Sequence, residues 1–328
     1  MFLRFVCIAA VLFATGCQEG TLQGADGPDI FVPTCDIIVQ ETVPSVGAAN
    51  AYYRAPIEFH LTQPDMGAVI VTDIPGVQSF RDEGRVVVWT PSDALEPSTN
   101  YSVGLEYCGG RPSLDFATSA FGTPVEIPIE DFVGRTYAVD LTGGRFLAGQ
   151  GLADLAATMF TKQMLLHVVA IDDDAVDLRI ALSQPGGSDD LQQDMCVRTL
   201  DLPPASLKFA PYMSFTAQDV AFGSYHSDIN LLDVELTGAI APDGSAVGGA
   251  TFAATVNAED IATAFEIADV ETLCEFAENL GLPCGACPDD SANTCVTVEA
   301  DHILAPEVPG LSVEEVTSAE THQDCIVD

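Results

Sequence analysis

The residues whose chemistry is easiest to specify are four cysteines near the end of the chain: Cys274, Cys284, Cys287 and Cys295. Four thiolates can hold a structural zinc ion, but such sites usually combine two closely spaced pairs, and only Cys284 and Cys287 form one. A redox Cys-x-x-Cys pair needs a thiolate of low pKa, typically at a helix N-terminus that follows a strand. Here the pair follows a predicted helix and lies between two prolines. Zinc binding and redox chemistry are therefore the less favoured interpretations.

Disulfide formation is the favoured interpretation of these cysteines, because exported proteins oxidise such thiols. Two disulfides would staple the preceding helix to a short hairpin around residues 288–290. The three pairings that four cysteines allow stay open. Cys196 and Cys325 are then the remaining pair, and their disulfide would fix the C-terminal tail.

Acidic turns are the second group of residues with a definable chemistry. Asp172, Asp174 and Asp177 could supply oxygen ligands to a weakly bound calcium ion, as could the pairs at 189–190 and 289–290. None of these runs has the spacing of an EF-hand loop. In a chain with 49 acidic residues such runs arise by chance, so we interpret them as solvated turns and expect no cofactor.

Signals of a catalytic nucleophile are missing from the sequence. It contains no Gly-x-Ser-x-Gly elbow, His-Glu-x-x-His pair, Walker loop or dinucleotide-binding glycine pattern. His60, His167 and His302 are isolated in the sequence and are interpreted as surface or core residues. A carboxylate pair for hydrolysis cannot be selected among so many acids without geometry. The sequence therefore predicts a protein that is not an enzyme.

The N-terminus has the features of an export signal. Arg4 gives a basic start, residues 5–13 are mostly apolar, and small residues precede Cys17. About 11 apolar residues are too few for a membrane span, which needs about 20. The small residues before Cys17 resemble the bacterial lipobox, at which the cysteine is acylated and becomes the new N-terminus. We expect a signal peptide over 1–16 and a lipid-anchored flexible tether over 17–34, with the membrane as a partner.

The residue after Cys17 is Gln18 rather than Asp, which in enteric-type sorting favours the outer membrane. The body of the protein would then lie in the cell envelope, on the periplasmic face or the cell surface. Beyond Cys17 the chain has eight cysteines, enough for four disulfides in that oxidising compartment.

The charge of the chain excludes one class of partner. With 49 acidic and 11 basic residues, the net charge is −38. Nucleic acids and anionic lipid headgroups are bound mainly through Lys and Arg at phosphates, so this surface repels them. We therefore expect no nucleic-acid partner. Such an acidic excess also resembles proteins from salty habitats.

The N-terminal part, residues 35–120, is predicted to be a set of short antiparallel strands separated by turns. Apolar residues alternate with Glu58 and His60 in a pattern typical of a half-buried strand. The predicted strands lie at 57–62, 86–90, 101–105 and 114–118.

These residues also form a recognisable pattern: Phe59, Pro64, Trp89-Thr90-Pro91, Leu95, Pro97, Thr99, Tyr101 and Phe116-Ala117-Thr118. The pattern resembles the bacterial Ig-like domain of S-layer and other surface proteins, with Trp89 where that family usually has Phe. The resemblance implies an antiparallel sandwich over 35–120 that spaces, adheres or presents. Cys35 and Cys108 are additions to the family pattern, and we predict a disulfide that joins the first strand to a late one.

Residues 121–328 are predicted to form a second, disulfide-stapled β domain, either a barrel or a broad sandwich. The expected strands and helices are a helix over 151–162, strands over 165–171 and 176–182, a hairpin of 232–236 with 252–256, and helices over 257–265 and 270–280. Gly281 is expected to cap the last helix. This half resembles C-terminal regions of predicted lipoproteins from myxobacteria-like organisms, a likeness that names no activity.

Taken together, the sequence predicts a mainly β, two-domain lipoprotein of the cell envelope. The favoured function is non-catalytic binding or presentation, with an envelope protein or a glycan as partner. The alternative is a carrier that holds a small apolar ligand inside the C-terminal β domain. A hydrolase that uses scattered carboxylates is the third choice, and it would need two acids with shifted pKa values in one cleft.

Overall fold

The computed structural model describes residues 35–139, 143–147, 162–172, 175–184, 191–209, 211–223, 228–264, 267–288 and 293–317. The expected signal peptide, Cys17, the tether and almost all of the helix predicted over 151–162 lie outside these residues. Contacts divide the chain into Met1–Asp36 and one compact unit, Ile37–Asp328. The described part is mainly β, as the sequence predicts.

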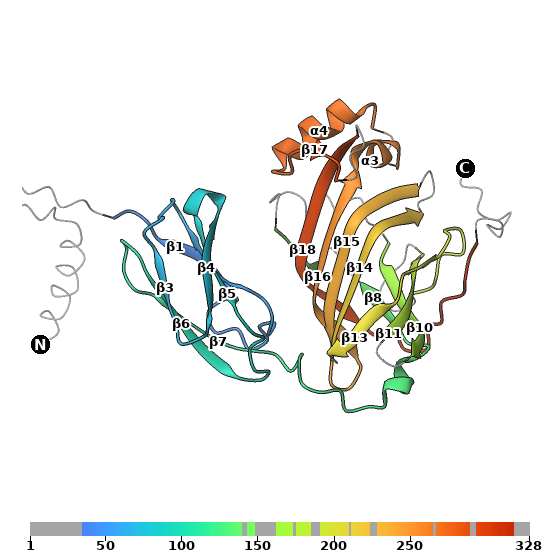
Figure 1. Ribbon diagram of the computed structural model, residues 1–328, viewed down its shortest axis with the longest axis horizontal. Coiled ribbons are helices and arrows are strands. Elements are labelled where there is room, and N and C mark those ends of the chain that lie inside the picture. The colour runs from blue at the N-terminus through green and yellow to red at the C-terminus, as the bar shows by residue number, and fades with distance from the viewer. Residues whose placement is uncertain are drawn as a thin grey trace, which may run out of the picture. The chain divides into compact units, whose positions relative to one another are not determined.

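The N-terminal part of the compact unit is a sandwich of two antiparallel sheets (Figure 1). Its strands are β1 (Val39–Val43), β2 (Ile57–Leu61), β3 (Val69–Val71), β4 (Gly76–Arg81), β5 (Val86–Pro91), β6 (Asn100–Glu106) and β7 (Ser113–Ala117). The described strands pair in the order β1-β2-β5-β4 in one sheet and β3-β6-β7 in the other. The alternating residues Ile57 and Phe59 of β2 point into a core with Val103 and Leu105 of β6, and each of these is at most 1% exposed.

The C-terminal part is built on one larger antiparallel sheet, which curls along its long strands (Figure 1). Its strands are β8 (Thr136–Val139), β9 (Arg145–Phe146), β10 (Met164–Asp172), β11 (Ala175–Leu182), β12 (Leu200–Asp201), β13 (Ala205–Phe209), β14 (Tyr212–Gly223), β15 (Asp228–Ile240), β16 (Ala246–Asn257), β17 (Gly285–Ala286) and β18 (Thr294–Pro306). The main path runs β17-β18-β16-β15-β14-β13-β11-β10-β8, with β12 beside β11 and β9 beside β18. The predicted hairpin around residues 242–244 is the turn between β15 and β16.

Two short helices, α3 (Ala258–Ala264) and α4 (Val270–Asn279), lie at one end of this sheet (Figure 1). The side chain of Asp269 caps the start of α4 by accepting a hydrogen bond from the Thr272 amide at 2.8 Å. The helix ends at Asn279; Gly281, which follows the C-cap residue Leu280, has a left-handed φ of 84°, and the Leu282 amide donates to the Ala277 carbonyl. Gly281 therefore acts as the predicted cap.

The core of the large sheet is filled by its own side chains. Phe132, Tyr137 and Leu166 are all at most 3% exposed, and the cavity they border has a volume of about 20 Å³. That is room for about one water molecule, whereas ligand pockets usually measure about 300–1,000 Å³. The described core thus gives no support to an apolar ligand carried inside this sheet.

A pair of glycines on β16 receives aromatic rings from the N-terminal half of the chain. A Cβ atom on Gly248 would lie 2.2 Å from the Phe121 ring, and one on Gly249 would lie 1.9 Å from the Tyr52 ring. Ala239 of the neighbouring strand, which is fully buried, belongs to the core cluster of the sandwich. Because glycine has no side chain, these two rings can pack directly on the backbone of the large sheet, and a larger residue at either position would clash with them.

Candidate functional site

Three neighbouring strands of the large sheet carry irregularities in their pairing. In β15, Asp233 (φ 48°) and Val234 together oppose one residue of β16. In β16, Gly249 (φ 56°) lies in a second irregularity against β15. In β18, Asp301 and His302 (φ 57°) together oppose one residue of β16. These are β-bulges, which bend a strand and redirect its side chains.

The irregularities of β16 and β18 border a polar pocket with a volume of about 250 Å³, and β15 contributes Glu235, which follows its own bulge. Its lining comes from the bulged strands, from the start of β14 and from the loop before β2: Tyr52, Arg54, Ala55, Pro56, Tyr212, Glu235, Thr237, Gly249, Thr251, Asp301 and His302. Thr237 and Thr251 are linked through their hydroxyl groups at 2.6 Å. Since β-bulges often occur beside functional sites, this pocket is the candidate site.

Tyr52 forms an inner wall of the pocket, with its ring against Gly249. The residue is 8% exposed, and its buried hydroxyl has no hydrogen-bond partner among the described residues. Burial, together with the neighbouring Tyr53, raises the pKa of this hydroxyl, so it stays a neutral donor at any physiological pH. A polar atom of a ligand could satisfy this donor.

Arg54 lies at the pocket with its guanidinium held by two aromatic rings. Its central carbon is 4.1 Å from the centre of the Tyr212 ring and 5.4 Å from that of Tyr53, and its Nε donates to Tyr53 Oη at 3.2 Å. No carboxylate pairs with Arg54 in the described part of the chain, although its side chain is exposed. The rings therefore hold an available positive charge at the pocket.

Below the pocket, a buried ion network joins the sandwich to the large sheet. Glu58 of β2 has no exposed surface, and it accepts hydrogen bonds from both terminal nitrogens of Arg145 on β9, at 2.8 and 3.1 Å. His60 approaches the same carboxylate at 2.9 Å, and Arg81 of β4 is also ion-paired with it. One carboxylate thus binds three basic side chains.

The same Arg145 connects this network to the pocket wall. Its Nε donates to Asp301 at 2.9 Å, and its Nη2 donates to the other oxygen of that carboxylate. Asp301 also lies 2.7 Å from Nδ1 of His302. The guanidinium therefore bridges two carboxylates in fork-like geometry and fixes the β18 bulge that borders the pocket.

Both carboxylates are held in the ionised state. Burial alone would raise the pKa of Glu58, but hydrogen bonds from His60 and Arg145, with the charges of Arg145 and Arg81, lower it to about 2. Burial likewise opposes ionisation of Asp301, yet hydrogen bonds from Arg145 and His302 leave its pKa below the usual value. At neutral pH neither acid holds a proton to donate.

The sequence interpretation was wrong or incomplete for several of these residues. Glu58 follows the polar face of a half-buried strand but is fully buried, because that face meets Arg145 rather than water. His60 and His302 are isolated in the sequence and half-buried, but in space each contacts a carboxylate of the network, which the sequence did not indicate. His167 is a core residue, as expected, bonded to the Thr136 hydroxyl at 2.9 Å, and burial lowers its pKa.

Sequence reasoning did not identify Tyr52, Arg54, Glu235 or Asp301 as site residues. A local signal of one irregularity is the pair of adjacent glycines at 248–249, which lies outside the strand predicted over 252–256 but inside β16. The rest of the site is assembled from distant segments.

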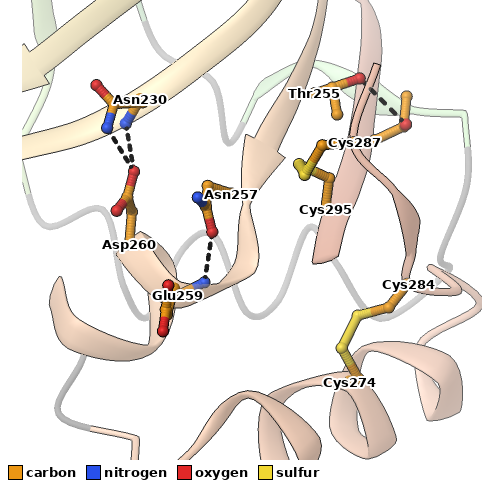
Figure 2. The surroundings of a disulfide bond; sticks show 10 residues. Asn230, Thr255, Asn257, Glu259, Asp260, Cys274, Cys284, Cys287 and Cys295 are labelled. Carbon is orange, nitrogen blue, oxygen red and sulfur yellow. Dashed lines mark hydrogen bonds between the residues drawn. A yellow bond between two sulfur atoms is a disulfide. The ribbon is translucent and has the colours of Figure 1, made fainter. Parts of the chain in front are cut away.

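The cysteine cluster lies at the end of the sheet that carries α3 and α4, and Figure 2 shows its pairing. Cys274 of α4 is bonded to Cys284, and Cys287 is bonded to Cys295 of β18, with Cα separations of 5.6 and 5.0 Å. The first disulfide ties the helix to the segment that follows it, and the second closes the β17–β18 hairpin. The two cysteines of the Cys-x-x-Cys pair thus have different partners and form no dithiol.

The remaining cysteines are only partly described. Cys35, Cys108 and Cys196 are disulfide-bonded, whereas Cys325 lies outside the described residues. The pairings Cys35–Cys108 and Cys196–Cys325 stay predictions.

Of the calcium candidates, the structure describes Asp172 and Asp177, and the pairs at 189–190 and 289–290 lie outside the described residues. Asp172 and Asp177 lie on the antiparallel strands β10 and β11, where their register partners are Ala175 and Ala170, and Asp174 lies outside the described residues. Within the described ranges, no three His, Cys, Asp or Glu side chains are grouped to hold a metal ion. No helix in the same ranges is long and apolar enough to cross a membrane.

Comparisons with known proteins add little to this geometry. No protein-family model matches the chain, and no curated protein matches it. Among solved structures the chain is similar to an L,D-transpeptidase from Mycobacterium smegmatis, at 13% identity, over 46% of this chain and 78% of that one. The TM-score is 0.22, so this likeness carries no argument about function.

Proposed function

We propose that the protein is a lipid-anchored, non-catalytic binding module of the cell envelope, and that its polar pocket binds a small polar ligand. The observation that carries the proposal is the pocket itself, about 250 Å³ in volume and bordered by three bulged strands. Its size, below that of pockets for drug-sized ligands, suits one sugar or amino-acid unit.

Binding fits the chemistry of this pocket better than catalysis does. A carboxylate-based hydrolase needs one acid with a raised pKa to protonate the leaving group and a second, ionised carboxylate. The pKa values of Glu58 and Asp301 are both lowered, and each carboxylate is already occupied by basic side chains. Asp301 thus forms part of the pocket wall instead of supplying a proton, and Glu58 does not line the pocket.

The walls are also fixed before any ligand arrives. The Tyr52 ring is held by the Gly249 backbone, the Arg54 guanidinium is held by Tyr212, and Asp301 is held by Arg145. Groups that are already ordered lose little conformational freedom when a ligand binds. This favours a site that selects one ligand class rather than a surface that adapts to many.

A binding screen tests the proposal. The full chain, with Cys17→Ser to remove the lipid, would be exported to an oxidising compartment and examined by native mass spectrometry with amino acids, dipeptides and monosaccharides. We expect one class to bind with 1:1 stoichiometry. Glu235→Trp should fill the pocket and abolish that binding, whereas Glu299→Trp, an exposed glutamate on β18 that does not line the pocket, should not.

Two results would overturn the proposed pocket. One is the absence of saturable binding by every class in the screen. The other is binding that survives Glu235→Trp, or that Glu299→Trp reduces equally.

The anchoring part of the proposal rests on the sequence before Cys17 and has its own test. The unaltered chain should partition with membranes after cell fractionation, and Cys17→Ser should release it into the soluble fraction. A Cys17→Ser protein that stays with the membranes would contradict lipid anchoring.

A further inference from the structure

Two side chains in the pocket carry charges that the protein leaves unneutralised. Arg54 contacts aromatic rings but no carboxylate among the described residues. Glu235 is exposed, and its carboxylate has neither a hydrogen bond nor an ion pair within the same part of the chain. Nor do the two pair with each other within 4.0 Å, although both line one pocket of about 250 Å³.

The availability of Arg54 is unusual for this chain. Other arginines of the described ranges are ion-paired with acids: Arg81, Arg85, Arg111, Arg135, Arg145 and Arg179. With 49 acidic residues in the sequence, an arginine near the surface readily meets a carboxylate. Arg54 instead contacts the rings of Tyr53 and Tyr212, which carry no negative charge, so its positive charge stays available at the pocket.

The orientation of Arg54 also suits a carboxylate ligand. One face of the guanidinium is covered by Tyr212, and Nε is used by Tyr53. Among the described residues, no group accepts a hydrogen bond from the two terminal nitrogens. These nitrogens form the planar edge that binds a carboxylate in bidentate geometry.

The other charge of the pocket has the opposite sign. Asp301 is neutralised by Arg145, so Glu235 is the acid of the pocket that remains available to a cationic group. The hydroxyls of Thr237 and Thr251, from adjacent strands, add uncharged donors and acceptors. The pocket thus presents one positive and one negative group to a single small occupant.

We infer that the ligand is a zwitterion, with a carboxylate bound by Arg54 and an ammonium group bound by Glu235. This inference rests on the proposed function of the pocket. A zwitterion has no net charge, so it escapes the long-range repulsion that a chain of net charge −38 exerts on anions. Free amino acids and dipeptides share this chemistry, and the volume of the pocket favours a free amino acid.

The test compares free amino acids with derivatives that lack one of the two charges, and with two probes of other classes. Isothermal titration with the Cys17→Ser chain would use the twenty free amino acids, then the amide and the N-acetyl derivative of the tightest binder, its homodipeptide, and glucose. The amide lacks the carboxylate, and the N-acetyl derivative lacks the ammonium group. We expect the free amino acid to bind at least tenfold more tightly than either derivative, because each loses a charge-assisted contact.

Variants assign the two contacts. Arg54→Gln and Glu235→Gln should each weaken the binding of the amino acid at least tenfold, and Arg54→Lys, which keeps the charge but loses the planar edge, should have a smaller effect. The matched controls Arg111→Gln and Glu299→Gln change the net charge equally outside the pocket and should stay within twofold of the parent. Unchanged circular dichroism would confirm that each variant is folded.

The outcomes separate this inference from the proposed function. If glucose binds in the pocket and Arg54→Gln has no effect, the zwitterion is wrong while the binding function stands. If the dipeptide binds more tightly than the free amino acid, the inference of a zwitterionic ligand holds, and the ligand is a short peptide rather than a free amino acid. If no probe binds, both the inference and the proposed function are overturned.

Discussion

Replacing Glu58 by glutamine tests the junction between the sandwich and the large sheet most directly. The substitution keeps the shape of the side chain but removes its charge, leaving Arg145 and Arg81 beside a neutral amide that is fully buried. Breaking one partner of a buried ion pair typically costs about 3–5 kcal/mol. The lowering of the Glu58 pKa from 4.5 to about 2 corresponds independently to about 3 kcal/mol at neutral pH.

The unfolding free energy can be followed with the single tryptophan of the chain, Trp89, which lies on β5 opposite Ile57 of β2. In urea at pH 7 we expect Glu58→Gln to lower the unfolding free energy by about 3 kcal/mol, with an unchanged dependence on urea. Far-ultraviolet circular dichroism would report the β structure of both parts, with the large sheet contributing most of the strand residues. Coincident transitions from the two probes would show that the sandwich and the sheet unfold together.

The same substitution predicts a pH dependence. Glu58 has its ordinary pKa near 4.5 when unfolded and about 2 when folded, so its contribution is complete above pH 4.5 and is lost as the pH falls toward 2. The difference between the parent and Glu58→Gln should therefore shrink from about 3 kcal/mol at pH 7 to near zero at pH 2. Taking the difference cancels the titration of the other acids.

An exposed ion pair provides the matched control. Glu106 pairs with Arg111 at 3.2 Å, with side chains 44% and 77% exposed, so Glu106→Gln should cost at most about 0.5 kcal/mol. The reasoning is refuted if Glu58→Gln costs less than about 1 kcal/mol, or if its cost is the same at pH 2 as at pH 7.

Two further predictions concern packing and the disulfides. Gly249→Ala should destabilise the protein by at least about 2 kcal/mol more than Gly310→Ala in urea unfolding, because both glycines have positive φ but only the Cβ at Gly249 would meet a ring, that of Tyr52; equal effects would contradict the docking of that ring. Replacing Cys274 and Cys284 together by alanine should cost about 3 kcal/mol, as expected for a loop of about ten residues. Thermal unfolding without reductant measures that cost, and an unchanged melting temperature would contradict it.

Only some of the strands could be predicted, those whose signal is local; β14 and β18, which both line the pocket, were not. Alternation of apolar and polar residues with a period of two identifies β2, β11 and the β15–β16 hairpin, and each pattern spans only a few neighbouring residues. Gly281 identified the end of α4 for the same reason, since a left-handed cap depends on one residue.

The site could not be predicted because it is not local. Arg145 meets Glu58 across 87 residues of sequence and Asp301 across 156, and no pattern within a strand records such contacts. The alternating pattern also gave a wrong prediction at Glu58. A polar residue on one face of a strand is exposed to water only when no other part of the protein packs on that face, and here Arg145 does. The bulges could not be predicted from the alternating pattern, because each bulge inserts a residue that interrupts the two-residue period of a strand.

We interpret the main role of the buried ion network as orienting the sandwich relative to the large sheet. Buried ion pairs often add no net stability over well-packed apolar residues, because desolvation offsets their attraction. What Arg145 supplies is direction: its fork aligns one carboxylate from the sandwich with one from the β18 bulge. The pocket has walls from both parts, the loop with Tyr52 and Arg54 on one side and the bulged strands on the other. Its geometry therefore depends on that alignment, and apolar residues in place of the network could preserve stability while losing the pocket.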